Sequence, residues 1–340
     1  MGFCLVFQLI TGFLLTFYYT PDIDLAFYCV EYLMRYLKYG WFLRYFHING
    51  ASVFFILIYL HIVKGLYYKS YYKKSLWLTG VVLWLFLIAI SFMGYVLPWG
   101  QMSYWGLVVI THLVTVIPIA GEFILNCIWG GPHISTMTLV RIYCMHFILP
   151  FLFAALALVH IIILHIEGSS SPIGIENFDN ITFLPYFYTK DLFSFFFFFL
   201  FIYIYLIFFF PNYLGEALNY IEVDYENTPM HIVPEWYFLF VYGMLRCIPR
   251  KTPGILISFG AILIFFILPF YPLSSIPARF DILHKFILSV FVCSAINISF
   301  LATFSMTPDI IFLSQIFTFF YFFFFILLLF NLVLEEFFKD

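Results

Sequence analysis

The sequence predicts an all-α membrane protein with eight transmembrane helices. Of its 340 residues, 64% are hydrophobic and only 10% are charged, and the mean hydropathy is +1.03. Soluble domains are roughly half apolar and about one quarter charged, so this composition excludes a soluble globular protein. Apolar runs of about 20 residues, the length that crosses a bilayer as a helix, recur along the chain. The alternating pattern of a membrane β-barrel is missing, which leaves helices as the spanning elements.

Eight apolar runs follow one another. The first begins within a few residues of Met1 and lacks the basic lead and the small-residue cleavage site of a secretory signal, so we interpret it as a span. A phenylalanine-rich run, FFFFFLFIYIYLIFFF, is typical of a helix that faces lipid, and we assign it no function. The expected spans lie near residues 2–19, 45–63, 77–97, 142–164, 191–210, 254–272, 282–302 and 311–333.

The distribution of Lys and Arg predicts the orientation. The segment from Pro98 to about Thr138 contains neither, whereas the short loop between the second and third spans contains four lysines. Positively charged short loops stay on the side of synthesis, so we expect the lysine-rich loop there, together with both termini. The four lysines of this loop are Lys64, Lys69, Lys73 and Lys74.

Two longer segments between spans are then expected on the opposite face. They cover residues 98–140 and 211–253. Each contains a stretch that looks helical but is too polar to span, namely SYWGLVVITHLVTVI and PEWYFLFVYGMLRCI. We predict that these surface helices form a roof over the bundle.

Two histidine pairs with one spacing are the main chemical signal. His47 and His61 lie fourteen residues apart in the second span, and His146 and His160 repeat this spacing in the fourth. Fourteen residues are just under four helical turns, so both members project from nearly one helix face, about 21 Å apart. The two spans cross in the same direction, which places His47 level with His146 and His61 level with His160. If the helices face each other, two stacked bis-imidazole sites result.

These histidines are best interpreted as haem ligands. A lone histidine in an apolar helix is most often a hydrogen-bonded packing residue, but polar groups inside spans favour function, and a doubled spacing rarely arises by chance. Two neutral imidazoles on one axis suit haem iron, and filling both axial positions favours electron transfer over dioxygen binding. Zinc would need a third or fourth ligand, which the pairs do not offer.

Glycines and cations near the histidines fit this interpretation. Gly80 and Gly94 in the third span are also fourteen residues apart. Glycine inside a helix costs stability unless another group must approach the backbone closely. We expect the edges of the haems to approach the helix at these two glycines. Arg44 and Lys64 flank the pair in the second span, where each could meet a haem propionate or simply extend to the membrane surface. The six scattered cysteines form no C-x-x-C pair, and we interpret them as small apolar residues.

The histidine pairs, with GYVLPWGQMSYWG and TPMHIVPEWYFLFVYGMLRCIP, resemble mitochondrial cytochrome b, the haem-bearing core of ubiquinol:cytochrome c oxidoreductase, respiratory complex III. The similarity covers nearly the whole chain, and its PEWY segment is highly specific. The resemblance implies eight transmembrane helices and surface helices on the intermembrane-space side. It also implies a haem-binding four-helix bundle over residues 1–190 and a carboxy-terminal region with the PEWY loop and four further helices over residues 191–340.

The resemblance implies two non-covalent b-type haems. A low-potential haem would lie near the intermembrane-space face on His47 and His146. A high-potential haem would lie near the matrix face on His61 and His160. Ubiquinol and ubiquinone are the implied substrates.

A quinol-oxidising pocket is implied under the PEWY segment. Glu235 of this segment corresponds to the family's proton acceptor from quinol. Without the motif, it could equally be a solvated carboxylate at the start of a helix, where the helix dipole favours the charged form. The other positions that line this pocket in the family are Tyr95, Gly106, Phe238 and Tyr242.

A quinone-reducing pocket is implied on the matrix side. The positions that line it in the family are His165, Ser169, Phe183 and Asp191, with Lys190 beside them. One electron from each quinol would cross the membrane through the two haems to this pocket and contribute to the proton gradient in a Q cycle.

The resemblance also implies partners and a location. The partners are a Rieske iron–sulfur protein, cytochrome c1 and other complex III subunits, a second copy of cytochrome b, and membrane lipids, and we expect no nucleic acid. The location is the mitochondrial inner membrane, which the chain would cross several times.

Three departures from the family pattern carry expectations of their own. The family pairs Gly12 with a glycine fourteen residues earlier, and that position precedes Met1 here. The amphipathic amino-terminal helix beside the quinone-reducing site is likewise not in the sequence, so that wall is expected to be missing, supplied by another chain, or lost to a misplaced start. Leu107 stands where the family usually has a very small residue, so we expect a reshaped quinol pocket.

Two other functions are compatible with the residues alone. A different transmembrane di-haem reductase without quinol chemistry would share the paired histidines but would not need the PEWY segment. A channel or transporter could use the histidines to relay protons. A reduced-minus-oxidised visible spectrum separates the second alternative, because a proton relay shows no haem bands.

Overall fold

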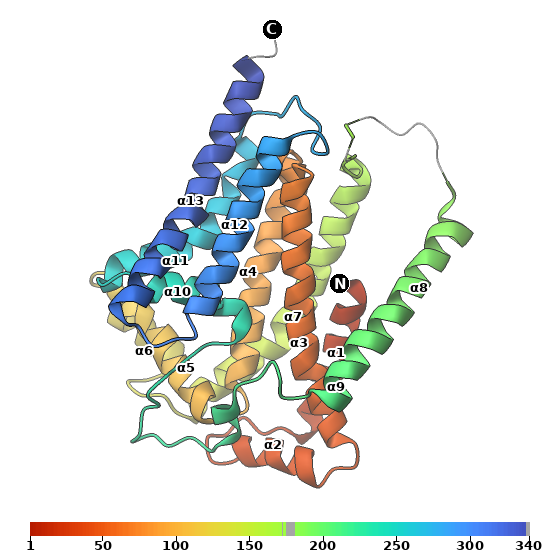
Figure 1. The fold of residues 1–340 in the computed structure, drawn as a ribbon. Coiled ribbons are helices and arrows are strands. Elements are labelled where there is room, and N and C mark those ends of the chain that lie inside the picture. Colours follow the sequence, from red (N-terminus) through yellow and green to blue (C-terminus); the bar gives the residue numbers. More distant parts are fainter. Residues whose placement is uncertain (172, 175–180, 338–340) are drawn as a thin grey trace. The chain divides into compact units, whose positions relative to one another are not determined.

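The computed structural model describes residues 1–171, 173–174 and 181–337, except for the side chains of residues 200–202. Figure 1 shows that the described chain is built from helices. Within it, the only β-type pairing is an isolated bridge between Gly100 and Glu222. The predicted all-α class is therefore confirmed for the described residues.

Five helices of the described chain are long and apolar enough to cross a membrane. They coincide with the second, third, fourth, seventh and eighth predicted spans, and the chain is therefore an integral membrane protein. The five are α3 (Gly40–Tyr67), α4 (Lys74–Val96), α7 (Thr136–Glu167), α12 (Ile282–Leu301) and α13 (Pro308–Phe337).

The other three predicted spans are shorter or broken helices. The first coincides with α1 (Gly2–Leu15) and the sixth with α11 (Lys251–Leu263), each extended by a short 3-10 turn. Beyond α11, Pro269 has no amide hydrogen with which to continue a helix, which is one reason why this span ends early. The fifth is divided into α8 (Tyr188–Phe198), a π-helical stretch and α9 (Tyr205–Phe209).

Four further short helices are α2, α5, α6 and α10. The two segments predicted as surface helices do contain helix, α5 (Gln101–Thr111) in the first and α10 (Leu239–Arg246) in the second. Helices α2 (Ala26–Arg35) and α6 (Gly121–Trp129) were not predicted from the sequence. The roof formed by the surface helices stays a prediction.

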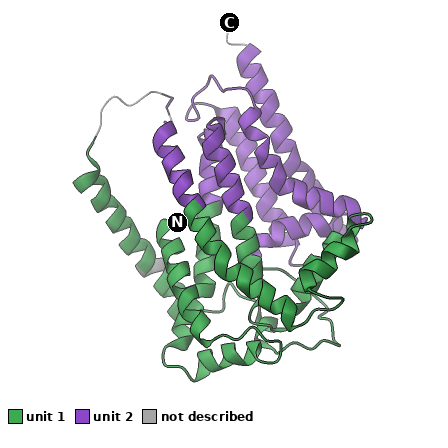
Figure 2. Ribbon diagram, turned by 180° about the vertical axis from the view of Figure 1, so that it is seen from behind, with its two compact units in different colours: residues 1–58, 86–155, 179–235 green, residues 59–85, 156–178, 236–340 purple. Residues whose placement is uncertain are grey.

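The described chain forms two compact units, each assembled from segments far apart in the sequence (Figure 2). The boundary between the units falls within α3, α4 and α7. Each unit therefore contains one histidine pair, His47 with His146 in unit 1 and His61 with His160 in unit 2. Unit 1 consists of residues 1–58, 86–155 and 179–235, and unit 2 consists of residues 59–85, 156–178 and 236–340.

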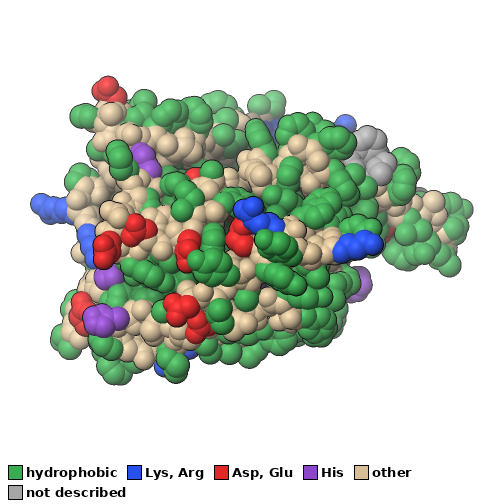
Figure 3. All heavy atoms as spheres, turned by 90° about the horizontal axis from the view of Figure 1, so that it is seen from below, with side chains coloured by type: hydrophobic (Ala, Val, Ile, Leu, Met, Phe, Trp, Pro, Cys, Tyr) green, Lys and Arg blue, Asp and Glu red, His purple; other side chains and the backbone are tan. Residues whose placement is uncertain are grey.

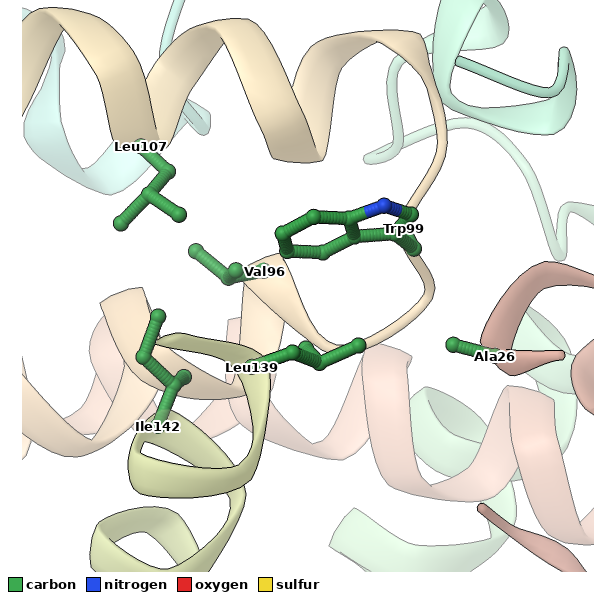
Figure 4. Packing of buried hydrophobic residues seen from close by; sticks show 6 residues of the cluster. All are labelled: Ala26, Val96, Trp99, Leu107, Leu139 and Ile142. Atoms are coloured by element: carbon green, nitrogen blue, oxygen red, sulfur yellow. The ribbon is translucent and has the colours of Figure 1, made fainter. Parts of the chain in front are cut away.

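A hydrophobic core in unit 1 joins α2, α4, α5 and α7 around the Pro98–Gly100 turn (Figure 4). Trp99 in this turn is 1% exposed, and its indole Nε1 donates a hydrogen bond of 3.0 Å to the Tyr225 hydroxyl. Leu107 is also 1% exposed and points into this core, which explains how the larger side chain is accommodated. The core residues are Ala26, Val96, Trp99, Leu107, Leu139 and Ile142.

Acidic residues are concentrated in the loops of unit 1. The segment 211–235 contains five Asp or Glu residues and neither Lys nor Arg. On the face seen in Figure 3, acidic side chains lie among hydrophobic ones. Exposed carboxylates need water, so these loops belong outside the lipid. The exposed acidic residues of these loops include Asp24, Glu222, Asp224 and Glu226.

In unit 2, α12 packs along α13, and α10 packs against both α11 and α12 (Figure 1). Gly243 allows the close contact between α10 and α12. A Cβ atom at this position would lie 2.7 Å from Cγ2 of Ile298 and 2.9 Å from its carbonyl oxygen. Glycine is therefore the residue that fits this crossing.

A buried ionic cluster joins the loop after α3 to the start of α12 and the end of α13. The Lys69 ammonium lies 2.6 Å from Oδ2 of Asp281 and 3.3 Å from Oε1 of Glu335. All three residues are less than 10% exposed, at 5%, 4% and 8%. Asn331 Nδ2 donates to both carboxylates, at 2.9 Å to Glu335 and 3.3 Å to Asp281. Ser274 also contacts both Lys69 and Glu335.

Hydrogen bonds keep the Asp281 carboxylate charged. Burial raises the pKa of Asp281, but hydrogen bonds from Lys69 and from the His284 amide outweigh it and hold the pKa below its usual value. Glu335 Oε2 accepts from the amides of Ser275 and Ile276, at 3.0 Å and 3.2 Å. A buried charge of this kind is tolerated only while its partners remain in place.

We expect Lys69→Met to destabilise the protein by about 3–5 kcal/mol, because it leaves two buried carboxylates without their cation. Thermal unfolding of the detergent-purified protein, followed by circular dichroism, measures the loss. Lys38→Met is the matched control, because Lys38 is exposed and forms no ion pair with any described residue. Equal unfolding temperatures for both variants would contradict a stabilising role for the cluster.

Candidate functional site: two histidine pairs

Helices α3 and α7 each contribute one histidine to a pair in each unit. In unit 1, the ring centres of His47 and His146 lie 6.4 Å apart, with the ring planes at 86°. In unit 2, the ring centres of His61 and His160 are also 6.4 Å apart, with the planes at 72°. These are the pairs expected from the fourteen-residue spacing.

The distance within each pair fits one metal ion between two imidazoles. A bond from a metal to an imidazole nitrogen is about 2 Å long, and two rings bound on opposite sides of one ion have centres roughly 6 Å apart. Among the described residues, no group of three or more His, Cys, Asp or Glu side chains could hold a metal ion. The donor set therefore suits a metal whose other ligands come from a macrocycle, as in haem.

In unit 1, two glycines face the imidazoles. A Cβ atom at Gly94 on α4 would lie 2.5 Å from Cε1 of His146, and one at Gly12 on α1 would lie 3.0 Å from Cε1 of His47. The first distance is too short for any real contact, so a side chain at Gly94 would displace the ring. The close approach of α4 to His146 depends on this glycine.

Gly80 on α4 has the same relation to the pair in unit 2. A Cβ atom there would lie 3.3 Å from Cε1 of His160, a tight contact that a small shift could relieve. We expected Gly80 and Gly94 to make room for the edges of haem. The ring of a histidine lies beside each glycine, and the close approach of the haem edges stays a prediction.

Three of the four rings are also fixed at Nδ1. Each of these nitrogens lies within hydrogen-bond distance of one oxygen atom on a neighbouring helix. A metal-binding histidine usually has its second nitrogen engaged in this way, which fixes the tautomer and the ring orientation. The pairs are His47 with the Thr11 hydroxyl at 2.9 Å, His160 with the Thr79 hydroxyl at 2.9 Å, and His146 with the Ile90 carbonyl at 2.8 Å.

Arg44 and Lys64 each lie three residues from a histidine of α3, and side chains at this spacing share a helix face. Arg44 is half-buried in unit 1 and forms no ion pair with any described residue. Lys64 is exposed in unit 2. Both remain candidates for contact with an anionic group beside the histidines.

The predicted quinol-side residues are distributed over both units. Tyr95, Gly106 and Glu235 belong to unit 1, and Phe238 and Tyr242 belong to unit 2. A Cβ atom at Gly106 would meet no atom within 4 Å, so this position borders open space. The Arg246 guanidinium lies over the Tyr242 ring, 5.0 Å from its centre.

Glu235 and Tyr95 have buried polar atoms without partners. Glu235 is 7% exposed, and within the described chain neither its Oε1 atom nor the Tyr95 hydroxyl has a hydrogen-bond partner. Most buried polar groups are paired, and these two atoms are among six in the described chain that are not. Burial, followed by repulsion from Glu216, raises the pKa of Glu235 to about 8.

The alternative interpretation of Glu235, a solvated carboxylate kept charged by a helix dipole, is wrong. Glu235 precedes a short 3-10 turn, and α10 begins only at Leu239, so the carboxyl group is not in the first turn of an α-helix. Desolvation of the charged form is the larger effect. At neutral pH the carboxyl group of Glu235 is therefore mostly protonated.

The predicted quinone-reducing residues also fall in both units. His165 and Ser169 belong to unit 2 and are exposed at the end of α7 and just beyond it. The Lys73 ammonium fixes this end by donating to the carbonyls of Glu167, at 3.1 Å, and Gly168.

Phe183, Lys190 and Asp191 belong to unit 1 and are exposed on the turn before α8 and on its first residues. Lys190 also lines a surface hollow with Pro185, Tyr186, Thr189 and Phe193. Part of the connection to α7, residues 172 and 175–180, lies outside the described chain.

Fold and site together define an integral membrane protein of helices with two bis-histidine sites. One family model, described as cytochrome b/b6/petB, matches residues 1–168, and another, described as cytochrome b(C-terminal)/b6/petD, matches residues 222–322. The chain belongs to the cytochrome b family. Membership implies that it binds b-type haem.

Relatives from distant organisms agree with this assignment. The chain is 48% identical over 272 residues to cytochrome b of Phytophthora megasperma, covering 79% of this chain and 71% of that protein. It is 46% identical over 304 residues to cytochrome b of Dictyostelium discoideum, covering 88% and 78%. A solved structure titled "Hyperthermophilic respiratory Complex III" matches with a TM-score of 0.91 at 30% identity, covering 98% of this chain and 89% of that one.

Sequence reasoning missed the residues that fix the histidines at Nδ1. Thr11 and Thr79 are common helix residues, and the Ile90 carbonyl has no sequence signal at all. The one available signal was the dipeptide Thr-Gly, which occurs at Thr11-Gly12 and again at Thr79-Gly80.

Gly94→Ala should reduce the haem bound per chain by at least half, because the new methyl group would occupy the position of the His146 ring. Gly80→Ala should have a smaller effect, since its contact with His160 is 3.3 Å. The measurement is haem absorbance per protein in purified membranes. Gly260→Ala is the control, because a Cβ atom there meets nothing within 4 Å. Full haem content in Gly94→Ala would show that the ring can move freely.

Proposed function

We propose that this chain is the haem-bearing core subunit of a ubiquinol:cytochrome c oxidoreductase. The observation that carries the proposal is the pair of bis-histidine sites, each with ring centres 6.4 Å apart. A haem at each site supplies a one-electron redox centre. His47 and His146 would hold the low-potential haem, and His61 and His160 the high-potential haem.

The division of the chain follows the same proposal. Residues 1–190 would form the haem-binding bundle, and residues 191–340 would contribute the PEWY loop and the remaining helices. The two family matches, over residues 1–168 and 222–322, fall within these regions and support the division. Of the eight transmembrane helices proposed, five are full-length in the described chain.

Quinol oxidation needs a proton acceptor in a dry site. A quinol that loses two electrons also loses two protons, and only an ionisable group within reach can take one. Glu235 is buried, has an unpaired oxygen and has a pKa of about 8, near the working pH of a general base. We assign the proton transfer to Glu235, with Tyr95, Tyr242, Phe238 and Gly106 lining the pocket.

The two electrons of quinol need two acceptors. The haems that His47, His146, His61 and His160 would hold would accept one of these electrons, and the quinone-reducing pocket would lie on the matrix side. There His165 and Asp191 would supply protons to quinone, with Lys190, Ser169 and Phe183 lining the pocket. The other electron requires an acceptor that this chain lacks, for which we propose a Rieske iron–sulfur protein followed by cytochrome c1. The structural relative titled as a respiratory complex III supports this assembly.

The remaining parts of the proposal concern assembly and place. We propose that the chain dimerises within the complex and lies in the mitochondrial inner membrane. Arg44 and Lys64 would pair with haem propionates. A di-haem reductase without quinol chemistry is the alternative, and the unpaired buried carboxyl of Glu235 within PEWY favours the quinol enzyme over it.

Replacing one histidine should remove one haem. His160→Leu is expected to remove the haem between His61 and His160 and to leave most of the other, whereas His146→Leu should do the reverse. Pyridine haemochrome spectra and reduced-minus-oxidised difference spectra of mitochondrial membranes measure this. His133→Leu is the control, because His133 is exposed and belongs to neither pair. Two full haems per chain in His160→Leu would overturn the ligand assignment.

Glu235→Gln should lower quinol oxidation roughly 10- to 100-fold, the usual contribution of a general base. In the wild type the rate should rise with pH towards a midpoint near 8, because a carboxyl group with a pKa of about 8 accepts protons only when deprotonated. The variant should lose this rise, and haem content should stay unchanged. Steady-state rates from pH 6 to 9 measure both.

Two further variants sharpen this test. Glu216→Gln removes the repulsion that helps to raise the pKa of Glu235, so the midpoint should move to lower pH. Glu226→Gln, an exposed carboxylate in the same segment, should change nothing. If Glu235→Gln keeps the wild-type rate and pH profile, Glu235 is not the proton acceptor. Another carrier, such as Tyr95 or a chain of water molecules, would then take the proton.

A further inference from the structure

The dipeptide Thr-Gly faces one histidine of each pair. In unit 1, Thr11 lies 2.9 Å from Nδ1 of His47, and a Cβ atom on Gly12 would lie 3.0 Å from Cε1 of the same ring. The threonine thus contacts one edge of the imidazole, and the glycine leaves room for the adjacent carbon.

Unit 2 repeats the arrangement with different helices. Thr79 lies 2.9 Å from Nδ1 of His160, and a Cβ atom on Gly80 would lie 3.3 Å from Cε1 of that ring. In unit 1 the dipeptide is on α1 and the histidine on α3, whereas in unit 2 they are on α4 and α7. One arrangement in two unrelated helix pairs points to a shared role.

The direction of each hydrogen bond follows from the proton count. The Thr11 hydroxyl donates its only proton to the Phe7 carbonyl at 2.7 Å, so it must accept from His47. The Thr79 hydroxyl donates to the Ser75 and Leu76 carbonyls at 2.9 Å each, so it accepts from His160. Nδ1 therefore holds the proton in both rings, and Nε2 presents its lone pair to a metal.

We infer that Thr11 and Thr79 are positioning residues, each fixing the tautomer and plane of one histidine of a pair and increasing the electron donation that this histidine would give to haem iron. The inference rests on the proposed haem sites. A hydrogen bond at Nδ1 makes the imidazole a stronger donor, and a stronger donor stabilises the ferric state and lowers the midpoint potential. Removing the hydroxyl must therefore raise the potential of that haem.

The two sites differ in how many rings are fixed. In unit 1, His146 also donates from Nδ1, to the Ile90 carbonyl at 2.8 Å. In unit 2, His61 has no hydrogen bond with any described residue, so Thr79 provides the only one. Removing the Thr79 hydroxyl should therefore shift the midpoint potential of the haem in unit 2 more than removing the Thr11 hydroxyl shifts that of the haem in unit 1.

The test uses Thr79→Val and Thr11→Val in the complete membrane complex. Potentiometric titration of the haem absorbance gives both midpoints, and electron paramagnetic resonance reports the ring planes of each ferric haem. Each variant should raise the midpoint of its own haem and shift that haem's resonance, with the other haem unchanged. Loss of only the corresponding haem also supports the inference. Thr79→Ser and Thr11→Ser keep the hydroxyl and should restore wild-type values.

Two control variants remove a hydroxyl that bonds only to its own helix. Ser91→Ala on α4 removes bonds to Leu87 and Ile88, and Thr16→Val after α1 removes a bond to Phe13. Both should leave the midpoints unchanged. The inference is overturned if Thr79→Val keeps the wild-type midpoint and resonance, if Val and Ser behave alike, or if the controls shift equally. A wild-type protein without b-haem bands would instead refute the proposed function.

Discussion

The close approach of helices to the imidazole rings is the constraint on which the rest of the site depends. Each pair has its ring centres 6.4 Å apart, and a third helix contacts at least one ring of each pair at a glycine. Glycine inside a helix destabilises the protein by about 1 kcal/mol relative to alanine, and three such positions therefore lower its stability noticeably. These glycines make room for the rings of His47, His146 and His160, which are half-buried among apolar helices. A charged imidazole in such surroundings would need a partner of opposite charge, whereas a neutral one does not.

Two buried glutamates show how the same residue type takes on different roles. Glu335 and Glu235 are 8% and 7% exposed, so their burial is nearly equal. Glu335 accepts hydrogen bonds from backbone amides, Asn331 and the Lys69 ammonium, and its charge belongs to a structural network. Glu235 has an unpaired oxygen, and its pKa is raised to about 8. Hydrogen-bond partners favour the charged form of a buried carboxylate, whereas burial without such partners favours the protonated form.

Features that repeat along one helix could be predicted from the sequence. Apolar length predicted the five long helices, and the fourteen-residue spacing predicted which histidines pair, because both follow from helix geometry alone. Features that join distant segments could not be predicted. Lys69 looked like one of four lysines in a basic loop, yet it is buried between Asp281 and Glu335, which lie more than 200 residues away.

The ionisation of single side chains and their hydrogen-bond partners also could not be predicted from the sequence. The ionisation of Glu235 depends on how deeply the fold buries it and on its distance from Glu216, and neither is visible in PEWY. The partners of Nδ1 depend on which helix face meets each ring. A carbonyl such as that of Ile90 carries no side-chain signal.

In the proposed function, the unequal hydrogen bonding of the two pairs gives a physical reason for a difference in potential between their haems. Both rings in unit 1 donate from Nδ1, to Thr11 and to Ile90, whereas among the residues that the structure describes one ring in unit 2 does so, to Thr79. More donation makes stronger ligands, and stronger ligands lower the midpoint potential of the iron between them. The site of His47 and His146 would then hold the more reducing haem, and an electron would move spontaneously from it to the site of His61 and His160. In the proposed function, a difference in potential between the two haems would thus come from hydrogen bonds to the ligands, without any difference in the ligands themselves.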